Sequence, residues 1–216
     1  MTAIELYLRL TFATGVVLAP GWLLARALGV RGFSASLGWS LALIFVALAV
    51  TFALSSTLNV TLALLGIAAV AAVTTRFVRG WPRSSSVPGR ARAFGWGALV
   101  GILLWWVAPA VSGDGLFHLA RARKLLELDE LSLDRVSEFA DGSLHPGYAF
   151  PLWHGFLALI ARISGTDPEQ VVVHLPSLLA PLAVVIAYEV GWALFRRTWA
   201  AGAVAGAQVA MICFAP

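Results

Sequence analysis

Long apolar segments that recur along the chain are the feature that most constrains its fold. Of its 216 residues, 60% are hydrophobic and only 12% are charged, whereas a soluble domain is about half apolar and a quarter charged. Several segments approach the roughly 20 residues with which a helix crosses about 30 Å of hydrocarbon. Backbone groups in lipid must be hydrogen-bonded internally, and the alternating pattern of an outer-membrane barrel is absent. The sequence therefore predicts an all-α polytopic transmembrane helix bundle, surrounded by membrane lipids.

Hydropathy and turn residues place the individual helices. The predicted apolar segments are 3–28, 34–54, 57–75, 94–112, 150–164, 170–195 and a last one from Trp199. Segment 150–164 is marginal for a full span, so it is either a short crossing or a re-entrant segment. Asp167 is expected to cap the next helix and Pro168 to begin it. Glu5 and Arg9, four residues apart, are expected to pair on a helix surface.

Charged residues orient these segments in the membrane. The loop that spans 76–93 contains five arginines and no acid, and short basic loops remain in the cytoplasm. The loop 113–149 is then extracytoplasmic, and it holds seven of the eleven acidic residues. These are Asp114, Glu127, Asp129, Glu130, Asp134, Glu138 and Asp141. The predicted location is the cell membrane, with multiple passes.

Composition also excludes several function classes. The single cysteine, Cys213, cannot form a disulfide framework or a cysteine-based zinc site. The basic character of the chain does not indicate nucleic-acid binding, because the arginines fall in short loops beside membrane spans. The oligomeric state is not indicated by the sequence.

The stretch "GDGLFHLARARKLLELDEL" predicts an amphipathic juxtamembrane helix over residues 115–130, with its leucines toward lipid. Asp114 and His118 are four residues apart and share a face, and Arg121 lies three residues further on the same side. Two interpretations stay open at this point. Asp114 is either an N-cap with a neighbouring histidine at the interface, or part of a polar site above the bilayer.

A second polar stretch, "DGSLHPGYAFPLWHGF", leads to the following apolar segment. It brings His145 and Pro146 to the mouth of that segment, with Tyr148 and His154 nearby. Two connected elements would thus deliver ionisable groups to one interface. The candidate substrate-binding residues are His118, Arg121, His145 and Tyr148. A metal ion held by Asp114 and His118, or a lipid-headgroup site, remains an alternative to catalysis.

Three motifs in this order resemble the first part of the C-type (GT-C) multi-span membrane glycosyltransferases. They are "GDGLFHLARARKLLE", "LHPGYAFPLWHGFLALIARISG", and the segment with His174-Leu175-Pro176-Ser177, Tyr188 and Leu194-Phe195-Arg196-Arg197. The similarity is to protein O-mannosyltransferases and lipid A aminoarabinose transferases, and it covers about 94–216. Residues 1–93 then form additional N-terminal helices and a basic cytoplasmic loop. We expect the chain to be the front part of a longer protein.

The resemblance implies transfer of a sugar from a polyprenyl-phosphate donor to an acceptor at the extracytoplasmic face. It assigns Asp114 as the catalytic carboxylate that orients or deprotonates the acceptor. A divalent metal ion is an open possibility as a cofactor. The family often has two adjacent acids, whereas Gly115 follows Asp114 here. The family layout also makes 150–164 a crossing, which places Arg196 and Arg197 outside, against the positive-inside preference.

Two other function classes remain open. A transporter or flippase would use Glu189, an acid inside a predicted span, together with the histidines as a polar path. A non-catalytic membrane subunit would use the additional N-terminal spans for assembly.

Overall fold

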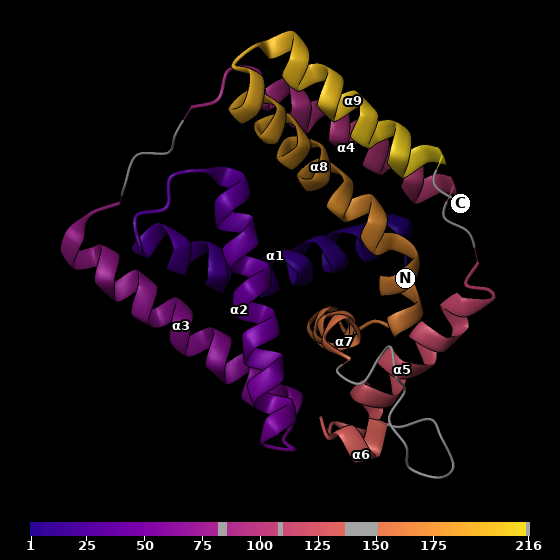
Figure 1. Ribbon diagram of the computed structural model, residues 1–216. Coiled ribbons are helices and arrows are strands. Elements are labelled where there is room, and N and C mark those ends of the chain that lie inside the picture. Colours follow the sequence, from indigo (N-terminus) through magenta and orange to yellow (C-terminus); the bar gives the residue numbers. More distant parts are fainter. Residues whose placement is uncertain (82–85, 108–109, 137–150, 215–216) are drawn as a thin grey trace. The chain divides into compact units, whose positions relative to one another are not determined.

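The computed structural model describes residues 1–81, 86–107, 110–136 and 151–214, and every regular element in this part is a helix (Figure 1). The helices are α1 (Ala3–Ala27), α2 (Phe33–Ala53), α3 (Leu58–Arg79), α4 (Arg90–Val107), α5 (Asp114–Leu128), α6 (Leu133–Val136), α7 (Leu152–Ser164), α8 (Pro168–Phe195) and α9 (Thr198–Phe214). The all-α prediction is confirmed, and most of the predicted boundaries lie within a few residues of these helix ends.

Among the described residues, α1, α2, α3 and α8 are long and apolar enough to cross a membrane, whereas α7 and α9 are shorter apolar helices. The prediction of a membrane protein is confirmed at this level. The predicted span 94–112 is observed as α4, which is not one of these four helices. Its first turn contains Arg90 and Arg92, so its apolar part is short.

The chain divides by its contacts into two compact units. Unit 1 comprises Met1–Arg31, Ala35–Pro82 and Val111–Val172, and unit 2 comprises Gly32–Ser34, Arg83–Ala110 and Val173–Pro216. Helices α1, α3, α5, α6 and α7 and most of α2 belong to unit 1, whereas α4, α9 and most of α8 belong to unit 2. Unit 1 thus groups α5 to α7 with helices that precede residue 93, and the predicted division at residue 93 stays a prediction.

One end of unit 1 is basic. Arg76, near the end of α3, donates from Nε to the carbonyl oxygen of Arg26 (2.9 Å) and from Nη2 to that of Ala27 (2.5 Å). These carbonyls belong to the last turn of α1, where helix carbonyls lack partners within the helix. The last turns of α1 and α3 therefore lie together, and with them Arg26, Arg76 and Arg79.

The other end of α3 meets the acidic part of the chain. The backbone N–H of Leu131 donates to the carbonyl of Ser56 in the α2–α3 turn (2.7 Å). Asp129 accepts from the N–H of Leu58 (3.0 Å), and Arg162 pairs with Asp129 (2.9 Å). Twenty-two helical residues, about 33 Å, separate this end of α3 from its basic end. Residues 129–131 and Arg76 thus lie at opposite ends of the same helix.

Helix α7 lies alongside α5 within unit 1. Near its start His154 is hydrogen-bonded to His118 of α5 (2.8 Å), and near its end Arg162 pairs with Asp129, just after α5. Every residue from His154 to Ala161 is buried. Its 13 residues rise about 20 Å, less than the roughly 30 Å of a bilayer core. The observed helix is therefore short for a full crossing, and the choice between a short crossing and a re-entrant segment stays a prediction.

In unit 2, α4 and α8 run antiparallel at close range. A Cβ atom on Gly97 would lie 2.6 Å from Cα of Pro181, and one on Gly101 would collide with the carbonyl of Ser177. The ring of Trp105 stacks on His174 with centroids 3.9 Å apart. Residue numbers thus increase along α4 in the direction in which they decrease along α8, so the two helices are antiparallel. Gly97 and Gly101, four residues apart, allow the two backbones to come this close.

The opposite end of the α4–α8 pair collects basic residues. Tyr188 donates to the carbonyl of Pro88 (2.6 Å), just before α4 begins. Gly191 faces Ala201 of α9, where an added Cβ would lie 2.8 Å from its Cα. The start of α4 and the α8–α9 turn with Arg196 and Arg197 therefore lie at the same end of unit 2.

Candidate active site

The start of α5 forms the candidate site, and Asp114 is not its N-cap. Gly113 occupies the cap position, with φ 56° and ψ −131°, a conformation that glycine tolerates, and no side chain caps the helix. Asp114 is the first helical residue, and its side chain is 79% exposed. The interpretation of Asp114 as an N-cap is therefore wrong, because its carboxylate does not cap α5.

The carboxylate of Asp114 begins a chain of three polar groups. Its Oδ2 atom lies 3.3 Å from Nε2 of His118, one helical turn further along α5. Nδ1 of His118 is hydrogen-bonded to Nε2 of His154 in α7 at 2.8 Å. The two imidazole rings are also stacked, with centroids 5.1 Å apart. An exposed carboxylate, a partly buried imidazole and a buried imidazole thus follow one another from solvent to interior.

His154 is the interior member of this chain, with 3% of its surface exposed. Burial, and then the charges of His118 and Arg121, lower the pKa of His154 to about 4. This ring is therefore neutral at pH 7, with a proton on one of its two nitrogens. The sequence placed His154 near the site without assigning it a role, because the 36 residues that separate it from His118 hide the contact.

Arg121 does not project to the surface with Asp114 and His118. Its side chain is 2% exposed, and the guanidinium lies over the ring of Phe117 at 5.4 Å. Leu119 and Leu125 are buried as well, although the sequence predicted leucines toward lipid. The cause is the packing of α7 on this face of α5, which turns the apolar stripe toward protein. Leu116 and Leu128 remain exposed.

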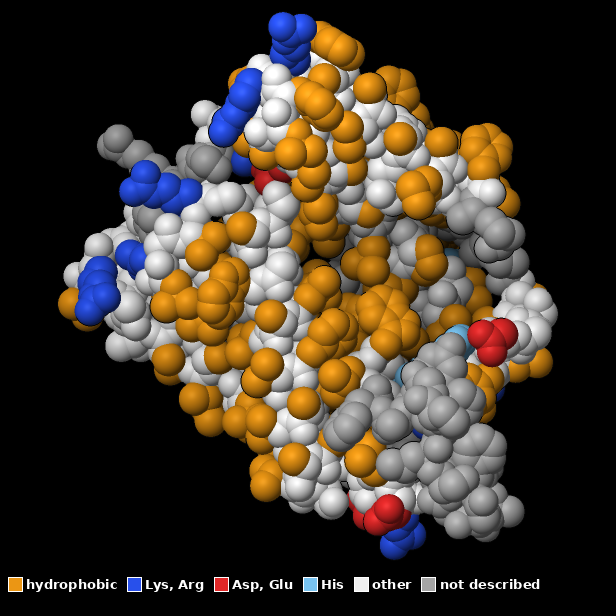
Figure 2. All heavy atoms as spheres, in the orientation of Figure 1, with side chains coloured by type: hydrophobic (Ala, Val, Ile, Leu, Met, Phe, Trp, Pro, Cys, Tyr) orange, Lys and Arg blue, Asp and Glu red, His pale blue; other side chains and the backbone are white. Residues whose placement is uncertain are grey.

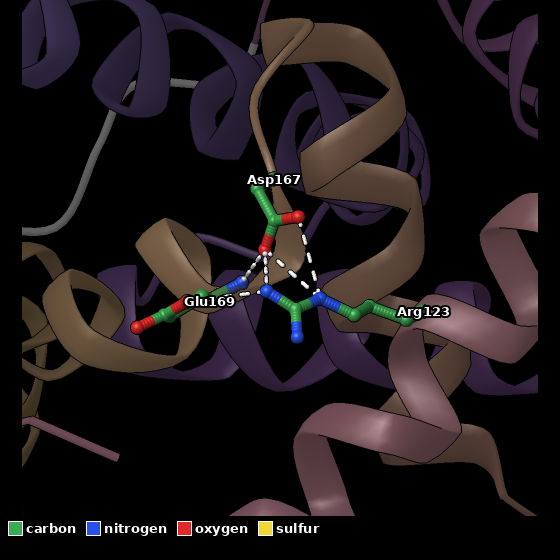
Figure 3. Close-up of polar contacts among 3 residues, drawn as sticks. All are labelled: Arg123, Asp167 and Glu169. Atoms are coloured by element: carbon green, nitrogen blue, oxygen red, sulfur yellow. Dashed lines mark hydrogen bonds and ion pairs between the residues drawn. The ribbon is translucent and has the colours of Figure 1, made fainter.

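A second contact fixes the middle of α5 to the start of α8 within unit 1 (Figure 3). Arg123 donates from Nη2 to Asp167 (2.8 Å) and to Glu169 (3.1 Å), and Asp167 also accepts from the N–H of Glu169 (2.8 Å). The predicted capping role of Asp167 is thus confirmed. Burial alone would raise the pKa of Asp167, but the hydrogen bonds and the charge of Arg123 lower it overall.

Two of the sequence-derived candidates, His145 and Tyr148, lie outside the described residues. Asp114 and His118 are brought together as predicted. Arg121 lies beside them in the sequence but is buried.

The described residues at this site do not make up a zinc-binding set. Such a catalytic ion takes three protein ligands, and within the described ranges no three His, Cys, Asp or Glu side chains gather with suitable geometry. Nε2 of His118 faces Asp114 and Nδ1 faces His154. Asp114 and His118 could therefore supply at most two ligands to one ion.

Glu189, the acid expected inside a span, has its own partners in unit 2. Its carboxylate pairs with Arg90 (2.5 Å) and accepts from the backbone N–H of Ser34 (2.9 Å) and from the Ser34 hydroxyl. A buried carboxylate with a paired arginine is neutralised locally. These contacts favour a structural role over a transport path.

Comparisons of the chain with protein-family models, with curated proteins and with solved structures gave no match.

Proposed function

We propose that the protein is a membrane glycosyltransferase that moves a sugar from a polyprenyl-phosphate donor to an acceptor, with Asp114 as the catalytic carboxylate. The observation that carries the proposal is the exposed Asp114 carboxylate backed by the His118–His154 pair. The Asp114 carboxylate neither caps a helix nor forms a strong ion pair, and it lies beside His118, which His154 holds in place. Such a carboxylate suits proton transfer better than a structural role.

In the proposed reaction, the acceptor oxygen attacks the anomeric carbon of the sugar. The new carbon–oxygen bond forms as the bond to the phosphate oxygen breaks, and the phosphate leaves with the bonding electrons. Asp114 takes the proton from the acceptor hydroxyl. His118, 3.3 Å away, orients the carboxylate and shares the proton, while neutral His154 holds the imidazole of His118 in place.

The same proposal places the site at the extracytoplasmic face. Within unit 1, Arg76 and residues 129–131 lie at opposite ends of α3. Basic loops remain in the cytoplasm, so the end that carries the acids faces outward. A donor with a polyprenyl tail would then approach α5 from the outer leaflet.

The proposal is tested with Asp114→Asn, which removes the charge and retains the size. Loss of a general base lowers transfer by about 10²–10⁴-fold. Stability should change little, because the side chain is 79% exposed and an acid in a first helical turn contributes only about 0.3–1 kcal/mol. Vesicles that contain the protein receive polyprenyl-phosphate mannose with a serine- and threonine-containing peptide as acceptor, or polyprenyl-phosphate aminoarabinose with lipid A as acceptor. Release of polyprenyl phosphate is measured.

The matched control is Asp134→Asn, an exposed carboxylate in the same loop, which should leave release within about twofold of wild type. If Asp114→Asn releases polyprenyl phosphate at the wild-type rate, Asp114 is not the catalytic carboxylate. If the wild-type protein releases none with either donor, the proposed reaction itself fails for these sugars.

A further inference from the structure

Unit 2 contains a groove that the proposed reaction does not use. Its volume is about 860 Å³, and helices α4, α8 and α9 line it. Much of the lining is small or apolar, including Ala93, Val184, Ala205 and Val209. Gly202 and Gly206 of α9 also face open space, since a Cβ added at either position would meet no atom within 4 Å. The groove is therefore wide and smooth along α9.

One end of this groove is basic. Arg92 and Thr198 belong to its lining, and the exposed Arg196 and Arg197 directly precede Thr198. Figure 2 shows basic side chains at the α8–α9 turn and hydrophobic side chains along these helices. Glu189 is the only acidic residue in the sequence of unit 2, and it pairs with Arg90. Three arginines at this end thus have no carboxylate of their own unit to balance them.

Tryptophans flank the boundary between the basic and apolar parts. Trp96 and Trp199 line the groove and are 65% and 70% exposed. Exposed tryptophan is typical of the level of lipid headgroups, where one part of the ring meets hydrocarbon and the N–H meets water. From its basic end, the groove is thus lined first by arginine, then by tryptophan and then by small apolar side chains.

We propose that this groove binds an anionic phospholipid, with one hydrocarbon chain along α9 and the phosphate at Arg92 and the Arg196–Arg197 turn. Basic pockets between membrane helices recognise anionic headgroups by charge. A second copy of this chain is a poorer occupant, because it would bring the same three arginines against each other. The inference stands on unit 2 alone and is independent of the proposed transfer reaction.

The test uses the purified chain in detergent, titrated with phosphatidylglycerol whose acyl chains carry bromine, a quencher of tryptophan fluorescence. Saturable quenching is expected with this lipid and not with brominated phosphatidylcholine. Arg92→Gln should weaken the apparent affinity by about fivefold, the effect of one basic residue near an anionic headgroup. Arg79→Gln, which removes an exposed arginine from the end of α3 in unit 1, is the charge control and should have no effect.

A second variant fills the groove. Gly206→Leu adds a side chain where the structure has open space, and leucine favours a helix over glycine. It should fold and abolish the saturable quenching, while Gly38→Leu, an equally open helical position of α2, should retain it. Equal saturable quenching by phosphatidylcholine would overturn the proposal, and so would quenching that persists in Gly206→Leu. If the wild-type protein is a dimer that Gly206→Leu dissociates, and quenching does not distinguish the two lipids, the occupant of the groove is a second copy of the chain and the lipid proposal is wrong.

Discussion

Asp114 and Asp167 are both aspartates at the start of a helix, and they have different roles. Asp167 accepts from the N–H of Glu169 and from Arg123, so its charge is used to hold the start of α8. Asp114 follows a glycine cap and directs its carboxylate at His118. Asp167 is thus a cap that precedes α8, whereas Asp114 is the first residue of α5 and its carboxylate stays exposed.

At the residue scale, Arg123→Gln should lower the free energy of unfolding at pH 7 by about 0.2–1 kcal/mol, the contribution typical of an exposed ion pair. The thermal unfolding midpoint should fall accordingly. The pKa of Asp167 is lowered in the folded protein. Its stabilising contribution is therefore present above the carboxyl pKa of an unfolded chain, about 3.9, and is lost as the pH falls further. The midpoints of wild type and variant, measured between pH 7 and pH 2, should converge at the acidic end.

Glu127→Gln is the comparison for this experiment, since it removes an exposed charge of α5. It should show no comparable loss at pH 7. A difference between wild type and Arg123→Gln that stayed constant down to pH 2 would show that Asp167 is not the partner that matters.

At the scale of elements, glycines decide how closely two helices approach. Gly97 and Gly101 lie on the face of α4 that meets α8, whereas a Cβ at Gly95 would meet no atom within 4 Å. Two small residues four apart are the usual means by which membrane helices bring their backbones together. The contact of α4 with α8 therefore depends on the absence of two side chains.

Gly101→Ala should destabilise the α4–α8 pair, because its new methyl group would collide with the carbonyl of Ser177. Overpacking of this kind costs about 1–3 kcal/mol. Gly95→Ala should instead be neutral or stabilising by about 0.5–1 kcal/mol, since alanine favours helix over glycine. Thermal unfolding of both variants in one detergent checks the opposite signs. Equal midpoints would mean that α4 and α8 do not approach as described.

At the scale of the whole molecule, the direction of α8 determines the layout. Helices α4 and α8 are antiparallel, with Arg196 and Arg197 at the end where α4 begins. If both cross the membrane, these arginines return to the side of the basic loop, in agreement with the positive-inside preference. If α7 contributes no crossing, this layout also removes the conflict between the family layout and the positive-inside preference.

Site-specific labelling tests this layout. Single cysteines are placed at Trp81 in the basic loop, at Asp134 in the acidic loop and at Arg197 in the α8–α9 turn, all exposed positions. The native cysteine, Cys213, is exposed and is first replaced by alanine. In sealed vesicles, a membrane-impermeant maleimide should label positions 81 and 197 from one side and position 134 from the other.

Labelling of positions 134 and 197 from the same side would restore 150–164 as a crossing. Labelling of positions 81 and 134 from the same side would refute the orientation of the acidic loop. The two results are separable, because each depends on a different pair of positions.

The sequence by itself determined the helices and the membrane class. A helix is held by hydrogen bonds between residues that are close in the sequence, and its ends are set by local caps and charges, as at Asp167. The length of each apolar segment can also be read directly from the sequence. The all-α class and most helix boundaries could therefore be predicted. The shared face of Asp114 and His118 was also predictable, because residues four apart on a helix always lie together.

Only the tertiary structure decided which faces meet. Two contacts join residues that are distant in the sequence: His118 with His154, and Asp129 with Arg162. The burial of Arg121 depends in turn on the packing of α7 on α5. An amphipathic pattern shows that one face of a helix is apolar and must be kept from water. Either lipid or another helix can cover that face, and the pattern does not distinguish the two. For that reason the sequence directed the leucines of α5 to lipid, whereas α7 covers Leu119 and Leu125 in the folded chain.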